Sequence, residues 1–316
     1  MENKLKIAFL DFDTLGYDLD TKQFDQFSEV IVYGHTQYHE TVKRLQNVDI
    51  AITNKVVIDK NIIDNTNLKL ICVAATGMNN IDLDYANLKK ITIKNVKGYS
   101  TNSVSQLTFT FALNFIQEFE YYTKYTQNKE WEKSHIFVNL DKPFVEICNK
   151  KWGIIGLGEI GKSVAKIAQA FGCEVQYYST SGHNNCQEFK KVDLGTILRT
   201  SDIISIHCPL NENTKNLISE KELRALRDKA IVINVGRGGI INEKHLAKVI
   251  DQKEIYVGLD VLEYEPINPA NPLNFISNKN RIKITPHIGW SSVEARNRLT
   301  EGILNNIKQF VLECKL

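Results

Sequence analysis

The chain has 316 residues, of which 43% are hydrophobic and 24% charged, and its 39 basic against 37 acidic residues give a formal charge of +2. This length predicts about two domains. The composition argues against whole-chain disorder, and the balanced charge argues against binding nucleic acid or a membrane surface.

The first hundred residues alternate short β-branched apolar runs with helix-like stretches, the pattern of a parallel sheet covered by helices. The predicted strands are 6–10, 30–32, 49–53, 69–74 and 91–95, and the clearest helices are 39–46 and 82–89. Residues 101–128 contain neither Gly nor Pro and repeat apolar side chains at helical spacing. They predict one long helix with Asn102 or Ser103 as its N-cap.

A second alternating series follows, and its six strands with crossovers favour a doubly wound dinucleotide-binding fold. Its predicted strands are 151–155, 174–178, 202–207, 230–235, 254–259 and 281–285, and its helices are 160–171, 188–198, 219–226 and 243–251. Residues 292–312 predict a terminal helix with no strand after it, which must bury its apolar face on the first half. We therefore expect a discontinuous domain of residues 1–100 plus 291–316, and a second domain of residues 101–290.

The sharpest motif is the glycine-rich turn at residues 156–161. Gly156 permits a tight turn, Gly158 lets backbone N–H groups approach a pyrophosphate, and Gly161 lets the following helix pack on the strand. The helix N-terminus, with Glu159 and Ile160 in its first turn, offers unpaired N–H donors to an anion. The preceding strand and following helix are the context that a dinucleotide site requires.

The strand after this motif ends at Ser179 with no acidic residue to bind the ribose 2′-hydroxyl and no Arg or Lys to attract the 2′-phosphate of NADP. Residues 178–187 supply no cation apart from His183. An unpaired buried phosphate charge is costly. The sequence therefore predicts a modest preference for NAD over NADP, with NADP not excluded.

Three further segments follow predicted strands and carry Arg237, Glu265 and His287. Because ligands bind beyond the carboxyl ends of strands in open α/β sheets, we expect these side chains to meet near the glycine-rich turn. A guanidinium matches a substrate carboxylate bidentately, and an imidazole transfers protons near neutral pH. A carboxylate beside the imidazole fixes its tautomer and stabilises its charged form. This set polarises a carbonyl without a metal.

These motifs resemble the D-isomer-specific 2-hydroxyacid dehydrogenases over nearly the whole chain. The matching segments are 234–239, 265–266 and 286–289, with 207–210, 76–82 and 103–106 as supporting ones. Residues 131–134 and Trp290 are most similar to the glycerate dehydrogenase (hydroxypyruvate reductase) branch. The resemblance implies two doubly wound parallel-sheet α/β domains, with a Rossmann cofactor domain inserted in a flavodoxin-like substrate domain.

The resemblance also implies the reaction, an NAD(P)-dependent hydride transfer between a 2-oxo acid and a D-2-hydroxy acid. Arg237, Glu265 and His287 would be catalytic, and the substrate would bind Arg237 and the loop of Thr76, Gly77, Met78 and Asn79. The expected cofactor contacts, besides those of the glycine-rich turn, are Val104, Ser179, His207, Cys208, Pro209, Thr214, Val235, Gly236 and Asp260. The resemblance implies that Asp260 contacts the nicotinamide carboxamide or the catalytic network. A homodimer is also implied, and the aromatic-rich stretch 121–144 has the composition of an interface.

Three alternatives stay open. A formate dehydrogenase shares the fold, although that branch places Gln where this chain has Glu265. A phosphonate-oxidising dehydrogenase shares the Arg, Glu and His, so substrate assays must separate it. A non-catalytic NAD-sensing protein of the corepressor type keeps the same residues but usually carries additional tails. The residues do not identify which 2-hydroxy acid is the substrate.

The cysteines indicate a reducing compartment. They are Cys72, Cys148, Cys173, Cys186, Cys208 and Cys314, with no C-x-x-C pair and no histidine at metal-ligand spacing. Reduced, mostly buried thiols in a cytoplasmic protein without a structural zinc are expected. The N-terminal apolar run is too short for a signal peptide, and no stretch has the length of a membrane helix.

Overall fold

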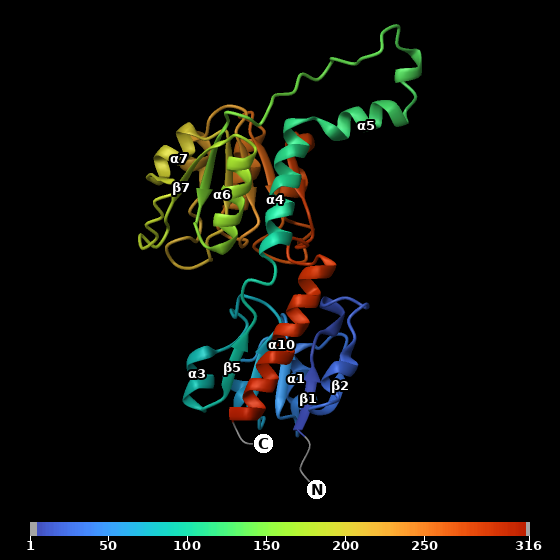
Figure 1. The fold of residues 1–316 in the computed structure, drawn as a ribbon, viewed down its shortest axis with the longest axis vertical. Coiled ribbons are helices and arrows are strands. Elements are labelled where there is room, and N and C mark those ends of the chain that lie inside the picture. Colours follow the sequence, from blue (N-terminus) through green and yellow to red (C-terminus); the bar gives the residue numbers. More distant parts are fainter. Residues whose placement is uncertain (1–4, 314–316) are drawn as a thin grey trace. The chain divides into compact units, whose positions relative to one another are not determined.

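A computed structural model describes residues 5–313, with the side chain of Ser28 left out. The chain divides into two compact units, one of Met1–Ser100 with Trp290–Leu316 and the other of Thr101–Gly289 (Figure 1). Each unit is built on its own parallel sheet, which confirms the predicted α/β fold class. Of the six cysteines, Cys314 lies outside the described residues.

The first unit is a five-stranded parallel sheet in the order β2-β1-β3-β4-β5. Its strands are β1 (Leu5–Phe9), β2 (Ser28–Val32), β3 (Ile50–Thr53), β4 (Leu70–Val73) and β5 (Thr92–Asn95). Its helices are α1 (Tyr38–Leu45), α2 (Lys60–Asp64), α3 (Leu83–Leu88) and the C-terminal α10 (Val293–Glu313). Helix α10 buries Leu299, Ile303 and Ile307 in one cluster with Ile7 and Leu70, so both ends of the chain share this core.

The second unit is a seven-stranded parallel sheet in the order β12-β11-β10-β9-β6-β7-β8. Its strands are β6 (Lys151–Ile155), β7 (Glu174–Tyr178), β8 (Lys190–Lys191), β9 (Ile203–Ile206), β10 (Ile231–Asn234), β11 (Tyr256–Leu259) and β12 (Ile282–Ile284). Its helices are α4 (Thr101–Ile116), α5 (Phe119–Gln127), α6 (Glu159–Ala170), α7 (Leu194–Thr200), α8 (Glu220–Ala225) and α9 (Glu243–Ile250).

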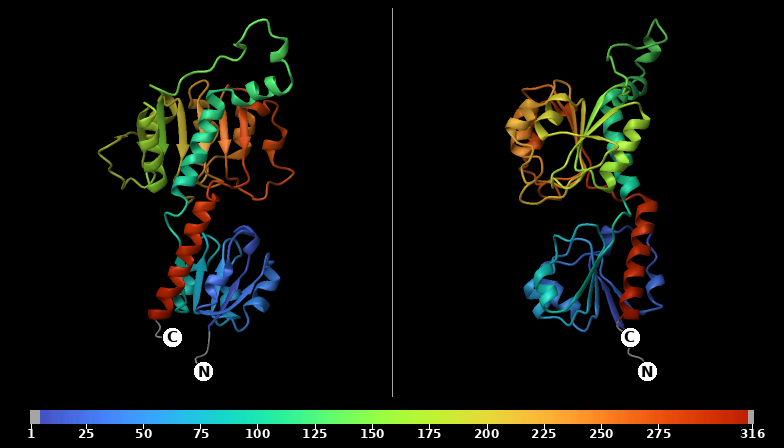
Figure 2. Two further views of the ribbon diagram at one scale, coloured as in Figure 1. Left: turned by 45° about the vertical axis from the view of Figure 1, so that its right-hand side comes forward. Right: turned by 60° about the vertical axis from the view of Figure 1, so that its left-hand side comes forward.

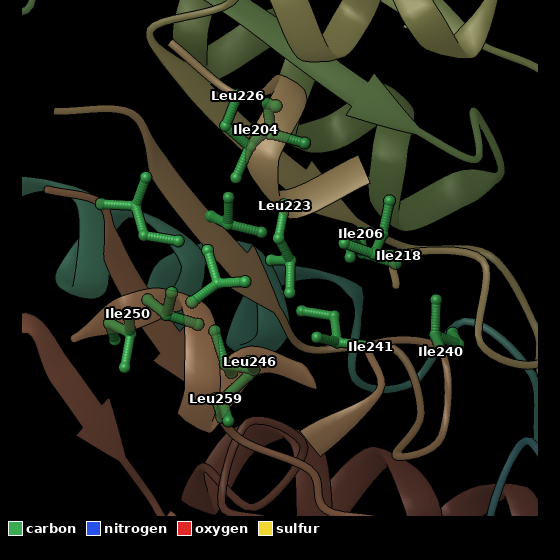
Figure 3. Close-up of a cluster of buried hydrophobic side chains, with 14 of the residues drawn as sticks. Ile204, Ile206, Ile218, Leu223, Leu226, Ile240, Ile241, Leu246, Ile250 and Leu259 are labelled. Atoms are coloured by element: carbon green, nitrogen blue, oxygen red, sulfur yellow. The ribbon is translucent and has the colours of Figure 1, made fainter. Parts of the chain in front are cut away.

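Helices cover both faces of this sheet, as Figure 2 shows, and each face has its own apolar core. Helices α4 and α6 pack on one face around the fully buried Trp152 and Tyr177. Helices α7, α8 and α9 pack on the other, where Leu223, Leu246 and Ile204 of β9 belong to one cluster of buried apolar side chains (Figure 3). Because the central strands are buried on both faces, their sequences are continuous apolar runs rather than alternating ones. This scaffold fixes where the strands end, and the site is built there.

Three sequence predictions were wrong in detail. The stretch 101–128 is two helices rather than one, because Glu118 has a left-handed φ of 48° between α4 and α5. Asn102 and Ser103 lie inside α4, which begins at Thr101, so neither is the N-cap.

The predicted helix at 188–198 was the third error. Lys190 and Lys191 form β8 beside β7, which adds a seventh strand to the six expected. Helix α7 begins only at Leu194, where the Asp193 carboxylate accepts the N–H of Thr196 at 2.9 Å. The apolar residues of this stretch have helical spacing, but burial of Phe189 and the pairing of Lys190 and Lys191 with β7 favour a strand.

Candidate active site

Three segments at the carboxyl ends of the neighbouring strands β10, β11 and β12 carry Arg237, Glu265 and His287. We call residues 235–239, 260–266 and 285–289 the strand-end loops. Backbone hydrogen bonds continue the sheet into them, since Asp260 N donates to Asn234 O at 3.0 Å and Thr285 N donates to Leu259 O at 2.9 Å. The three loops therefore start in register from one rigid sheet edge.

His287 and Glu265 form a close polar pair within the strand-end loops. His287 Nδ1 lies 2.6 Å from Glu265 Oε2, and both side chains are partly exposed, at 22% and 31%. The other Glu265 oxygen, Oε1, accepts the N–H of Leu262 at 3.0 Å, which fixes the carboxylate plane. Within the described residues, Nε2 of His287 has no hydrogen-bond partner. The carboxylate thus holds Nδ1 of the imidazole, and Nε2 is left to exchange a proton with a ligand.

Asp260 holds the turn that carries His287. Its side chain is 2% exposed, and its carboxylate accepts the Thr285 hydroxyl at 2.6 Å and the N–H groups of Ile288 and Gly289, each at 2.8 Å. Its backbone carbonyl accepts the N–H of His287 at 2.9 Å. These bonds keep His287 in the left-handed region, at φ 54°, which costs free energy for any residue with a side chain. The carboxylate predicted to contact the nicotinamide carboxamide or the catalytic network thus holds the turn that carries His287.

The loops that carry Arg237 and Glu265 touch through a glycine. A Cβ placed on Gly238 would lie 1.9 Å from the carbonyl oxygen of Leu262, so only glycine permits this approach. From the other side, the buried carboxylate of Glu243 accepts the N–H of Glu263 and the side-chain amide of Asn271, both at 2.6 Å. Sequence reasoning missed Glu243 because an acidic residue in the first turn of a helix is common and indicates no site.

Arg237 follows β10 in a turn that hydrogen bonds of Asn234 stabilise. Asn234 Nδ2 donates to the Arg237 carbonyl at 2.8 Å, and Asn234 Oδ1 accepts the N–H of Gly236 at 3.1 Å. Arg237 Nη1 donates to Gly236 O at 2.8 Å, and the guanidinium pairs with no carboxylate among residues 5–313. Its remaining donors can therefore bind a planar anion bidentately.

The glycine-rich turn connects β6 to helix α6 and leaves a row of unpaired donors. Within the described residues, the N–H groups of Leu157, Gly158, Glu159 and Ile160 have no hydrogen-bond acceptor. A Cβ on Gly158 would meet nothing within 4 Å, whereas one on Gly161 would lie 2.2 Å from Gly156 O. Open space above Gly158 and unpaired N–H groups at a helix N-terminus fit a pyrophosphate.

The segment after β9 lies directly against this turn. A Cβ on Gly156 would lie 2.6 Å from the backbone N of Cys208, so the two backbones pack in contact. His207 Nε2 lies 2.9 Å from Ser205 Oγ, while its buried Nδ1 has no partner in the described part of the chain. Burial lowers the pKa of His207 to about 3, so its ring is neutral.

The remaining predicted cofactor contacts, Thr214, Val104 and Val235, interact mainly with other residues of the protein. Thr214 is fully buried and donates its hydroxyl to Pro209 O at 2.6 Å, which closes the loop on itself. Val104 of α4 and Val235 after β10 share an apolar cluster with Leu157 of the glycine-rich turn. These residues therefore lie beside the glycine-rich turn, where they offer backbone carbonyls and apolar surface rather than charged groups.

Residues 179–187, which we call the ribose loop, follow β7. Ser179 is 6% exposed, and its Oγ accepts the N–H of Asn184 at 3.3 Å. Asn184 Nδ2 donates to Leu157 O at 3.3 Å, which ties the ribose loop to the glycine-rich turn. Lys191 of β8 donates from Nζ to Gly182 O at 3.0 Å and to Asn185 Oδ1 at 2.9 Å. The prediction that only His183 supplies a cation here was therefore incomplete, because Lys191 lies outside the loop in sequence.

The predicted substrate loop belongs to the first unit and follows β4. Thr76 Oγ1 donates to Val96 O at 3.1 Å, and Thr76 O accepts the side-chain amide of Asn95 at 2.6 Å. Among the residues that the structure describes, the N–H groups of Gly77, Met78 and Asn79 have no hydrogen-bond acceptor. Three successive unpaired N–H groups are a suitable site for a carboxylate.

Within residues 5–313, no three His, Cys, Asp or Glu side chains are grouped as metal ligands. Over the same residues, no helix is both long and apolar enough to cross a membrane. The five described cysteines are free thiols, of which Cys72, Cys173 and Cys208 are buried.

Comparison with known proteins gives consistent results. The model of the D-isomer specific 2-hydroxyacid dehydrogenase NAD binding domain matches residues 109–289. The chain is 33% identical to the hydroxypyruvate reductase of Blautia hydrogenotrophica, covering 97% of both chains. It is 34% identical to the glycerate dehydrogenase of Methylorubrum extorquens, covering 97% of this chain and 96% of that one. Among solved structures, an acyclic imino acid reductase in complex with NADPH and D-Arg matches with a TM-score of 0.86, 27% identity and 98% coverage of both chains.

Proposed function

Since this chain belongs to the D-isomer-specific 2-hydroxyacid dehydrogenase family, and is therefore an NAD(P)-dependent oxidoreductase, we propose that it interconverts hydroxypyruvate and D-glycerate. The proposal of this substrate pair rests on the two relatives named above, whose similarity extends over nearly the whole chain. When bound, NAD(P)H supplies the hydride that reduces C2 of the 2-oxo acid. The other steps belong to side chains of this protein.

The observation that carries the proposal is the His287–Glu265 pair at 2.6 Å. During reduction, Nε2–H of the imidazolium donates its proton to the carbonyl oxygen as negative charge develops there. In oxidation, the neutral Nε2 takes the proton back from the hydroxyl. Glu265 holds the Nδ1–H and stabilises the imidazolium. General acid–base help of this kind increases the rate by about 10² to 10⁴.

Arg237 binds the substrate carboxylate. Its guanidinium has donors to spare and no competing carboxylate among the described residues, which supports bidentate binding. Gly77, Met78 and Asn79 of the first unit provide N–H groups for the same kind of anion, which supports the role that the family implies for the Thr76–Asn79 loop. The positive charges of Arg237 and the imidazolium also polarise the carbonyl.

Asp260 and Glu243 are positioning residues in this mechanism. Asp260 holds the turn with His287, and Glu243 holds the loop with Glu265. Asp260 thereby acts on the reaction through His287. The cofactor is bound by the N–H groups from Leu157 to Ile160, by the segment with His207, Cys208 and Pro209, and by Ser179 at the ribose.

The protein is proposed to act as a cytoplasmic homodimer. Free thiols support a reducing compartment. The stretch that follows α4 exposes Trp131 by 50%, Phe137 by 88% and Phe144 by 58%. Large exposed aromatics on one segment are typical of an interface. Light scattering is expected to give the mass of two chains at micromolar concentration, and the mass of one chain would contradict the dimer.

A steady-state assay tests the proposed reaction. Purified protein is given NADH with hydroxypyruvate, glyoxylate, pyruvate and larger 2-oxo acids in turn, and in the reverse direction NAD+ with D-glycerate, L-glycerate, formate and phosphonate. We expect the highest kcat/KM with hydroxypyruvate and no turnover of L-glycerate. Turnover of formate or phosphonate alone would assign one of the alternative dehydrogenases, and NADH binding without any turnover would assign a sensor.

A further inference from the structure

The ribose loop is where a dinucleotide-binding domain distinguishes NAD from NADP, and here its charge comes from a residue outside the loop. A carboxylate at the end of β7 would bind the 2′-hydroxyl and repel a 2′-phosphate, but Ser179 occupies that position. Residues 179–187 contain no Asp, Glu, Lys or Arg. The ammonium of Lys191 reaches this loop from β8.

Strand pairing explains how Lys191 reaches the loop. Lys191 is in register with Tyr177 of β7, and Lys190 is in register with Gln176. Since side chains alternate along a strand, Lys191 and Lys190 lie on opposite faces of the sheet. Tyr177 accepts the N–H of Cys186 through its hydroxyl at 2.9 Å, so the ribose loop folds over the face that Lys191 shares.

The Lys191 charge is available to a ligand. Its side chain is exposed, and within the described residues it forms no ion pair with a carboxylate. Two of its three N–H donors are used by Gly182 O and Asn185 Oδ1, which leaves one. Those two bonds also hold the ammonium beside the loop, so the charge is positioned before a ligand arrives.

The ribose loop is connected to the site that holds the pyrophosphate. Asn184 donates to the carbonyl of Leu157 in the glycine-rich turn, and Gly156 N donates to Tyr178 O at 3.0 Å. A dinucleotide held at this turn places its adenosine ribose at the end of β7. We infer that Lys191 binds the 2′-phosphate of NADP(H), so that this protein accepts NADP(H) as well as NAD(H). The inference rests on the NAD(P)-dependent activity proposed above.

Two fragments that differ only in the phosphate test this assignment without catalysis. Calorimetry compares the binding of 2′-phospho-ADP-ribose with that of ADP-ribose at pH 8. In Lys191→Met, the Kd of 2′-phospho-ADP-ribose is expected to rise about tenfold, the size of one charge-assisted hydrogen bond. The Kd of ADP-ribose is expected to stay within about twofold of wild type, because only the 2′-phosphate loses a partner.

Matched variants and salt separate the charge from the loop's shape. Lys190→Met removes an equal charge on the opposite face and should leave both Kd values unchanged, and Lys191→Arg should retain binding of 2′-phospho-ADP-ribose. In wild type, added KCl should weaken the binding of 2′-phospho-ADP-ribose more steeply than the binding of ADP-ribose. Equal weakening of both fragments in Lys191→Met would mean that Lys191 only braces the loop, and an unchanged Kd would likewise overturn the assignment. If ADP-ribose does not bind wild type, the proposed function fails instead.

Discussion

The strand-end loops and the ribose loop are both built beyond the ends of parallel strands, but they are held differently. The strand-end loops are cross-linked by two buried carboxylates, Asp260 and Glu243, and by the contact at Gly238. The ribose loop is exposed over most of its length and is held by one hydrogen bond from Asn184 to the glycine-rich turn and by two from Lys191. Groups that transfer protons need fixed geometry, whereas a charge that selects a cofactor needs only to be near it.

Replacing His287 is the change with the largest expected effect, and it affects the strand-end loops alone. In His287→Ala, the kcat for hydroxypyruvate reduction should fall by about 10² to 10⁴, because the imidazole held by Glu265 that donates the proton is removed. The Kd of NADH, measured by fluorescence, should stay near wild type. His39→Ala, which removes an exposed histidine of the first unit, is the control and should leave kcat unchanged. Near wild-type turnover in His287→Ala would exclude the imidazole as the acid.

Arg237→Lys tests whether planar recognition matters as well as charge. A lysine keeps the charge but loses the fork of donors. We expect KM for the 2-oxo acid to rise by about tenfold or more and kcat to fall, because the carboxylate loses one of two charge-assisted bonds. Initial-rate kinetics at saturating NADH measure this. If the substrate KM is unchanged and only NADH affinity falls, Arg237 belongs with the cofactor contacts.

Gly238→Ala tests the close contact between the loops that carry Arg237 and Glu265. The added methyl group would lie 1.9 Å from Leu262 O, so the loops with Arg237 and Glu265 must separate. We expect kcat/KM to fall by about tenfold and unfolding to become easier by about 1–3 kcal/mol, as for other overpacked sites. Gly195→Ala in α7 is the control, since its methyl group would meet mainly the mobile end of Arg199. Equal activity in the two variants would show that the loops are not held by this contact.

His207 gives a smaller effect, on stability rather than turnover. Burial lowers its pKa to about 3 from the usual 6.5, so between these values the unfolded chain binds more protons than the folded one. Stability is therefore lost as pH falls below about 6.5. In His207→Gln, the loss of unfolding free energy between pH 7 and pH 5 should be smaller by about 1–2 kcal/mol. Urea titrations at the two pH values measure this, and an identical loss in both proteins would mean that His207 is not neutral in the fold.

The same contrast explains how much the sequence could predict. The glycine-rich turn and the Arg237, Glu265 and His287 segments could be located because their residues are consecutive and directly follow apolar strands. The alternating pattern also predicted both sheets and the return of the C-terminal helix to the first unit. These features depend on local sequence and on buried strands, which have a periodicity that can be read directly.

What could not be predicted depends on contacts between distant residues. Lys191 reaches the ribose loop only because two residues at 190–191 pair with β7, inside a stretch with helical spacing. Asp260 is bound to residues 285–289, and Glu243 to residues 263 and 271, by bonds that no local pattern reveals. Glu118 interrupts the long helix although no glycine or proline is nearby. Tertiary contacts decide such positions, and a single sequence does not display them.

The most direct test of the central claim is a crystal structure of the protein with NADH and oxamate, an unreactive analogue of a 2-oxo acid. The distances to measure run from the oxamate carboxylate to the Arg237 guanidinium and from its carbonyl oxygen to His287 Nε2. The account predicts that both are hydrogen bonds of about 2.7–3.2 Å. Oxamate bound away from Arg237, or with its carbonyl out of reach of His287 Nε2, would contradict the account.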